Sequence, residues 1–185
     1  GDVYKRQFLA LSIIWRINAR KYISSDTVAS AYDSWTQDKL LERLWGEHIH
    51  LGFYPSGKKN IDFRKAKVQF VHELVKWSGL DKLPKGSRIL DVGCGIGGSS
   101  RILAKYYGFN VTGITISPAQ VKRARELTPI GLNCNFQVMD ALNLKFEDGS
   151  FDAVWSVEAG AHMNDKSKFA AVSYTHLRAH ETVVY

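Results

Sequence analysis

The run from Ile89 to Gly98, ILDVGCGIGG, constrains the fold of this chain more than any other segment. Apolar residues and one acid, Asp91, lead directly into a turn that contains four glycines. Such a turn carries few Cβ atoms, so a ligand can approach its backbone closely. The run therefore predicts a buried strand that ends in a ligand-binding turn and continues into a helix ending near Tyr107.

The charge of Asp91 narrows the choice of ligand. Gly93, Gly95 and Gly98 match the G-x-G-x-x-G spacing that also occurs in dinucleotide-binding proteins. A carboxylate repels a diphosphate, however, and attracts the ammonium group of an amino acid. The ligand that joins a nucleoside to an amino-acid tail without a phosphate is S-adenosylmethionine, which we predict as the cofactor. The residues expected to hold it here are Asp91, Val92, Gly93, Cys94, Gly95 and Gly97.

The rest of the pattern predicts an α/β fold of Rossmann-like type. Helices are predicted at residues 26–46, 62–78, 97–107 and 118–127, with a loop at 46–57. Strands are predicted at residues 88–92, 110–114, 135–139 and 151–155. Alternation of strands with helices indicates a parallel sheet with right-handed crossovers, preceded by N-terminal helices. Four strands make an incomplete sheet for this type of fold.

Polar residues follow the second and third predicted strands, at the sheet edge where open parallel sheets bind ligands. After the second strand come Thr115 and Ile116, and Gln120 lies one helical turn further on. Dinucleotide enzymes place an acid near this position, whereas Thr115 offers a hydroxyl for the ribose, with Gln120 as a second contact. Asp140 and Ala141 follow the third strand. The alternative for Asp140 is to cap the next turn.

The composition, 45% hydrophobic and 23% charged, is that of an ordinary globular domain. Cys94 and Cys134 are 40 residues apart and suggest neither a disulfide framework nor a zinc site, so no metal is predicted. The formal net charge is +7, of which residues 1–22 carry +4 beside the apolar run Phe8–Trp15. This distribution is typical of the flank of a membrane anchor, so we expect no nucleic-acid partner.

Five strings resemble known methyltransferases. The glycine run resembles motif I of class I methyltransferases. The other four resemble the methyltransferases of the tocopherol and plastoquinone pathway: AYD at 31–33, WGEHIHLGFY at 45–54, GITISP at 113–118 and VWSVEAGAHM at 154–163. The match covers nearly all of residues 22–171. Ala161 stands where γ-tocopherol methyltransferases typically have glutamate, which favours the cyanobacterial type that methylates 2-methyl-6-phytyl-1,4-hydroquinone.

The resemblance implies a class I methyltransferase fold and methyl transfer to a ring carbon of a small lipophilic prenylated hydroquinone. It implies that Asp140 accepts from the adenine amino group, and that Tyr32 contacts the cofactor carboxylate or packs in a helix core. A base that promotes phenolate formation would assist the transfer. The candidate catalytic residues are His162, Glu158, His50 and His48, although each histidine alone also fits a structural role. The alternatives are a γ-tocopherol or other small-molecule methyltransferase, an NAD(P)-binding oxidoreductase, and a non-catalytic cofactor-binding fragment.

Both ends of the chain, residues 1–7 and 172–185, resemble translated adaptor sequence and are set aside from the fold. The apolar run is too short to span a bilayer, which needs about 20 residues, so we interpret residues 8–22 as the remnant of an N-terminal anchor. Residues 23–84 are expected to form a helical cap, and residues 85–171 a truncated cofactor-binding domain. The parent protein is then expected at a membrane surface on the cytoplasmic side, and the truncated chain is expected to be inactive.

Overall fold

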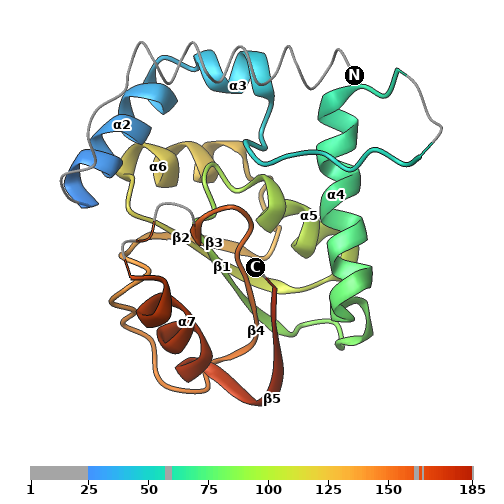
Figure 1. Ribbon diagram of the computed structural model, residues 1–185, viewed down its shortest axis with the longest axis vertical. Helices are drawn as coiled ribbons and strands as arrows, with labels where there is room; N and C mark the ends of the chain where they lie inside the picture. The colour runs from blue at the N-terminus through green and yellow to red at the C-terminus, as the bar shows by residue number, and fades with distance from the viewer. Residues whose placement is uncertain (1–24, 57–59, 161–162, 164, 185) are drawn as a thin grey trace.

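The computed structural model describes residues 25–56, 60–160, 163 and 165–184. Its centre is a five-stranded parallel sheet in the order β3-β2-β1-β4-β5 (Figure 1). The strands are β1 (Arg88–Val92), β2 (Asn110–Thr115), β3 (Cys134–Val138), β4 (Phe151–Trp155) and β5 (Leu177–Val184). The helices are α2 (Ser25–Gln37), α3 (Leu40–Trp45), α4 (Phe63–Ser78), the 3-10 turn η1 (Leu80–Lys82), α5 (Gly98–Tyr107), α6 (Pro118–Leu127) and α7 (Lys166–Thr175).

The central strand β1 is buried on both faces, as its apolar sequence requires. Ile89 faces a core formed with α4 and α5, which includes Val71 and Leu103. Leu90 and Val92 face the opposite core, where Phe169 of α7 packs. The helices thus cover both faces of the sheet, which leaves its carboxyl edge as the place where a ligand can enter.

The helix ends follow from residues that satisfy backbone groups. Asp62 caps α4 by accepting from the amides of Arg64 and Lys65, and Gly79 ends it in the left-handed conformation with φ of 77°. Ser117 caps α6 and Pro118 occupies its first position. The sequence analysis predicted both helices, and the structure confirms them.

The N-terminal helical region differs from the prediction at one point. The sequence pattern predicts one helix over residues 26–46, but the structure contains two helices, α2 and α3, with Lys39 between them at φ of 52°. Residues 36–39 at the break are polar, but apolar positions resume at Leu40 and Leu41 after Trp35, and this spacing did not reveal the break. Both helices lie at the top in Figure 1, and α2 packs against α6.

The C-terminal region adds elements that the sequence analysis did not assign. The four predicted strands are present, and the α/β fold is confirmed. Helix α7 and a fifth strand, β5, follow them, and β5 pairs with β4 in parallel. The sheet therefore does not stop at its fourth strand, because residues 177–184, set aside as foreign sequence, continue it.

The anchor remnant proposed at residues 8–22 lies outside the described residues, as does the first foreign segment, residues 1–7. Within the part of the chain that the structure describes, no helix has the length and apolarity needed to cross a membrane.

Candidate functional site

A cavity of about 340 Å³ opens at the carboxyl edge of the sheet, within the size range of small-molecule sites. Its floor is formed by the segments that follow β1, β2, β3 and β4. Its outer wall is formed by α2 and by residues 46–56, which we call the rim loop. Ten of the residues that sequence analysis assigned to the cofactor line it: Tyr32, Asp91, Gly93, Cys94, Gly95, Thr115, Ile116, Gln120, Asp140 and Ala141.

The glycine turn presents open backbone to this cavity. The amides of Gly93 and Cys94 both donate to the carbonyl oxygen of Ile114, at 2.9 and 3.0 Å, which fixes the turn against β2. Gly95 has φ of +54°, and a Cβ placed on it would meet no atom within 4 Å. A ligand can therefore lie directly on this residue.

Two residues predicted to contact the cofactor do not line the cavity. Val92 is fully buried in the core between β1 and α7. Gly97 is the N-cap of α5 with φ of 81°, and a Cβ on it would lie 2.6 Å from the ring of Phe136. Both residues therefore support the turn through contacts away from the cavity.

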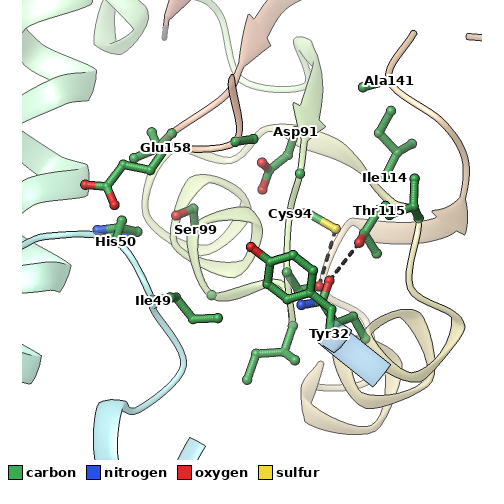
Figure 2. A pocket seen from close by; sticks show the side chains of 18 of the residues that line it. Tyr32, Ile49, His50, Asp91, Cys94, Ser99, Ile114, Thr115, Ala141 and Glu158 are labelled. Carbon is green, nitrogen blue, oxygen red and sulfur yellow. Dashed lines mark hydrogen bonds between the residues drawn. The ribbon is translucent and has the colours of Figure 1, made fainter. Parts of the chain in front are cut away.

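Asp91 lies on the floor of the cavity with only 2% of its surface exposed. Its Oδ2 accepts a hydrogen bond from the hydroxyl of Ser100 at 2.5 Å. Burial raises the pKa of Asp91 from 3.8 to about 7, because the charged form loses its hydration. A cation brought next to this carboxylate would reverse that shift, since an opposite charge favours ionisation. Figure 2 shows the carboxylate directed into the pocket.

Trp155 stands beside Asp91, because the two residues are paired in the register of β1 and β4. Its side chain is fully buried and lines the cavity. Among the described residues, the indole N–H has no hydrogen-bond partner. A buried donor without a partner is costly, so this N–H is available to an acceptor in the cavity.

The end of β2 carries a short polar network. The hydroxyl of Thr115 donates to Oε1 of Gln120 at 2.7 Å, and both side chains are buried. Ser117 acts as the cap of α6, and its hydroxyl donates to the carboxylate of Asp33 on α2. Asp33 also accepts from the amide of Ala119 at 3.1 Å, so α2 is tied to the start of α6.

The remaining predicted cofactor residues lie around the mouth of the cavity. Asp140 lines the cavity and also accepts from the amide of Leu142 at 2.8 Å. Its side chain therefore caps the next turn, as the alternative prediction had it, and also adjoins the cavity. Tyr32 projects from α2, and Figure 2 shows its hydroxyl pointing into the pocket. Burial raises the pKa of Tyr32, which therefore remains a neutral phenol.

The rim loop brings His48 and His50 together as a buried hydrogen-bonded pair, with Nδ1 of His48 3.0 Å from Nε2 of His50. Nδ1 of His50 lies 2.8 Å from the carbonyl oxygen of Leu51, which can only accept. Nδ1 of His50 therefore donates, and Nε2 of a neutral His50 accepts from His48. By this direction, Nε2 of His48 is left as a bare acceptor.

Burial lowers the pKa of both imidazoles, that of His48 from 6.5 to about 3, so both rings are neutral near pH 7. Glu158, which follows β4, lies next to His50 in Figure 2 and opposes the lowering of its pKa. The carboxylate of Glu158 accepts from the amide of Leu51 at 3.0 Å. His162, the fourth candidate, lies outside the described residues.

Two buried cations hold the rim loop in place. Lys67 of α4, 2% exposed, donates to the carbonyl oxygens of His48 at 2.7 Å and Trp45 at 3.3 Å. Arg101 of α5 forms an ion pair with Glu47 at 2.6 Å. The loop is thus attached to both helices that pack on the sheet behind it.

Sequence reasoning missed several residues that line the cavity or support it. Ile49, Ser99, Met139 and Trp155 line the cavity, and Ser100 and Lys67 hold parts of its wall. A signal for Lys67 was present, since a lysine lies among the apolar positions of residues 63–75 where a charge is unusual. No local signal marks Trp155, which faces the cavity only because β4 pairs with β1.

A family model described as a methyltransferase domain matches residues 89–180. The chain is 62% identical over 157 residues to the 2-methyl-6-phytyl-1,4-hydroquinone methyltransferase of Synechocystis sp., which covers 85% of the chain and 49% of that protein. It is 44% identical over 140 residues to the chloroplastic tocopherol O-methyltransferase of Arabidopsis thaliana, which covers 70% of the chain and 40% of that protein. The chain spans about half or less of the length of these curated relatives.

Among solved structures, the chain resembles phosphoethanolamine N-methyltransferase 2 of Haemonchus contortus in complex with S-adenosyl-L-methionine. The TM-score is 0.64 at 25% identity, over 82% of this chain and 32% of that one. The similarity agrees with the parallel sheet.

Proposed function

The chain belongs to the class I methyltransferases, and on that premise we propose that its full protein transfers a methyl group from S-adenosylmethionine to a ring carbon of a prenylated hydroquinone. One observation carries the proposal: a single cavity holds both the glycine turn led by Asp91 and the neutral pair His48–His50. The name of the Synechocystis relative supports a substrate of the 2-methyl-6-phytyl-1,4-hydroquinone type.

The residues present suit S-adenosylmethionine. Asp91 is a buried acceptor whose ionisation an ammonium group would favour, and Gly95 leaves the space that a Cβ would fill. The indole N–H of Trp155 is a donor in need of an acceptor. Thr115 and Gln120 offer hydroxyl and amide groups for a ribose, and Asp140 an acceptor for an exocyclic amine.

When bound, S-adenosylmethionine would supply an electrophilic methyl group on a sulfonium ion. The protein must then make the ring carbon of the acceptor more nucleophilic, because a phenol with a pKa near 10 is mostly un-ionised at neutral pH. Deprotonation of the phenol does this. The buried cavity adds to the effect by excluding water while charge is neutralised.

We assign the phenolic proton to Nε2 of His48, the bare acceptor of the histidine pair. As His48 gains this proton, its Nδ1–H can pass to Nε2 of His50 along the 3.0 Å hydrogen bond. The positive charge then rests on His50, beside the carboxylate of Glu158, which favours it. The low pKa of His48 means that it holds the proton only briefly. His162 remains a further candidate base on sequence grounds.

A second candidate substrate is a tocopherol, supported by the 44% identity to a tocopherol O-methyltransferase. A different class, a nicotinamide oxidoreductase, is opposed by the buried Asp91 at the glycine turn and by Thr115 in place of an acid after β2. A non-catalytic cofactor-binding role is the remaining alternative.

We further propose, from the sequence, that residues 23–84 form the helical cap and residues 85–171 the cofactor-binding domain. Residues 8–22 are proposed as part of a membrane anchor that keeps the protein at a membrane on the cytoplasmic side. The foreign origin of residues 1–7 and 172–185 is likewise a proposal, which the reading frame of the full gene tests.

The experiment has two stages. Calorimetric titration of the chain with S-adenosylmethionine and with NAD tests the cofactor, and binding of NAD alone would refute the cofactor assignment. Turnover of the full protein is then measured on 2-methyl-6-phytyl-1,4-hydroquinone and γ-tocopherol side by side. Methylation of γ-tocopherol alone would reject our substrate, and methylation of neither would reject the substrate class.

A further inference from the structure

The rim loop presents a row of exposed apolar side chains to solvent. Its residues alternate in burial, as in an extended strand: His48 and His50 are buried, while Ile49, Leu51 and Phe53 are exposed. The exposed fractions of these three residues are 44%, 54% and 38%. We call these three residues the apolar stripe. Large apolar side chains gathered in this way on a protein surface commonly mark an interaction site.

The stripe is held rigidly in this exposed position. The amide of Leu51 donates to Glu158 at 3.0 Å, and the amide of Phe53 donates to the carbonyl oxygen of Ala66 at 2.9 Å. Gly52 faces α4 so closely that a Cβ on it would lie 2.8 Å from the Cβ of Ala66. The loop therefore cannot rotate its apolar face inward without breaking these contacts.

Cationic residues lie near the stripe. The guanidinium of Arg64 donates to the main-chain carbonyl oxygen of Arg43 at 2.5 Å, so the Arg64 side chain lies where the rim loop begins. Arg43 is exposed there as well. Lys65, also exposed, adjoins Ala66 where the loop approaches α4. Within the described ranges, none of these three forms an ion pair.

Two acids near the stripe, Asp62 and Glu158, form no ion pair in the described part of the chain. They oppose the three exposed bases and the buried Lys67, which leaves the local charge positive. Glu47 is paired with Arg101, and Glu42 with Arg123, each at 2.6 Å. Asp62 accepts from two amides at the start of α4. An apolar row beside an excess of cations is an arrangement that favours the interface of an anionic lipid bilayer.

We propose that the apolar stripe inserts into the surface of an anionic membrane and sets the mouth of the cavity against it. Ile49 belongs to both the stripe and the cavity lining, so the two are continuous. Resting on the proposed function, this contact gives a prenylated substrate a path from bilayer to cavity without crossing water. It is separate from any anchoring by residues 8–22.

The test places an environment-sensitive fluorophore on the stripe, in the variant Leu51→Cys, and adds vesicles. The native thiols are less accessible, since Cys94 is buried and Cys134 is partly buried. The control, Ile130→Cys, replaces a fully exposed apolar residue in the loop before β3, at the opposite edge of the sheet. Vesicles of phosphatidylcholine mixed with phosphatidylglycerol are compared with vesicles of phosphatidylcholine alone.

We expect the emission of the label at position 51 to shift to the blue with anionic vesicles, and that of the label at position 130 to stay unchanged. Phe53→Ser should weaken vesicle partitioning about tenfold, the loss expected for one large apolar contact. Lys65→Gln should weaken it about fivefold on anionic vesicles only.

Three results would overturn the proposal. One is vesicle binding through other parts of the chain without a shift at position 51. Another is an equal shift at positions 51 and 130. A third is a shift at position 51 that depends on protein concentration without vesicles, which would assign the stripe to a second copy of the chain. Calorimetry with S-adenosylmethionine on the Phe53→Ser variant distinguishes failure of the membrane contact from failure of the proposed function. Phe53 does not line the cavity, so cofactor binding should be unchanged in this variant.

Discussion

The amide of Leu51 donates to the carboxylate of Glu158 across 107 residues of sequence, at a distance of 3.0 Å. This single bond joins the rim loop to the segment that follows β4. It also places the negative charge of Glu158 next to His50, which hydrogen-bonds to both His48 and the carbonyl oxygen of Leu51.

Replacing Glu158 separates these two roles. Glu158→Gln retains an oxygen that can accept from Leu51 but removes the charge, whereas Glu158→Ala removes both. We expect amide hydrogen exchange at Leu51 to accelerate about tenfold or more in the alanine variant, since a hydrogen bond to a charged group is worth about 1.5–3 kcal/mol. The glutamine variant should show a smaller change. If the charge of Glu158 assists proton transfer from His48 to His50, both variants lose turnover in the full protein. Loss in the alanine variant alone would mean that only the position of the loop matters.

Asp91→Asn should stabilise the chain at neutral pH while it weakens cofactor binding. The raised pKa of Asp91 means that, between about pH 3.8 and 7, the folded state holds a proton that the unfolded state has lost. The free energy of unfolding of the parent therefore falls as pH rises through this window, by at most about 4 kcal/mol. Asparagine is neutral throughout and avoids this penalty.

The measurement is the difference in urea unfolding free energy between the Asp91→Asn variant and its parent, from acidic to mildly basic pH. The difference should grow in favour of the variant up to about pH 7 and then level off. Taking the difference removes the opposing effect of His48, whose lowered pKa makes the fold less stable as pH falls below about 6.5. A difference that is constant with pH would contradict the raised pKa of Asp91.

Cofactor affinity should follow the ionisation of the same carboxyl. An ammonium group binds the carboxylate form, so affinity for S-adenosylmethionine should rise as pH increases through the pKa of Asp91, about 7. Calorimetry over this range gives the profile directly. Asp91→Asn should bind at least tenfold more weakly at neutral pH and lose the dependence on pH, while equal affinity in variant and parent would exclude Asp91 as a contact.

Gly98→Ala tests how closely the rim loop packs on α5. A Cβ at position 98 would lie 2.5 Å from the carbonyl oxygen of Glu47 and 2.8 Å from Cε1 of His48. The loop must move, and overpacking of this kind costs about 1–3 kcal/mol. We expect lower stability in urea unfolding and weaker cofactor binding. Gly160→Ala, where a Cβ would meet only the ring of Phe169 at 3.8 Å, is the matched control and should change little.

Local signals were enough to predict the central sheet and its helix ends. The strand at residues 88–92 and the cap at Ser117 depend on neighbouring residues alone, and both were predicted with the observed bounds. The break at Lys39 was missed because a left-handed residue leaves no trace in apolar periodicity. Helix α7 and β5 were missed for a different reason, since most of their residues had been set aside as foreign sequence.

The site was predictable where it lies on one stretch of chain, and not where it depends on pairing between distant segments. The glycine turn and Asp91 were predicted to lie at one site because strand, turn and helix are consecutive, and in the structure they line one cavity. The order of hydrogen bonds from His48 to Leu51 needs coordinates, since it is fixed by which atom lies near a carbonyl oxygen. The position of the buried Trp155 beside Asp91 likewise follows from the register of β4 against β1.

The rim loop has a consequence for how the chain is made. Leu51 is synthesised 107 residues before its acceptor Glu158. At ordinary rates of translation this is about 5 to 20 seconds, during which α4 and the glycine turn can form but the loop has no sheet edge to close against. The wall of the cavity is therefore completed late in synthesis, and until then the face of the rim loop that carries His48 and His50 is open to chaperones.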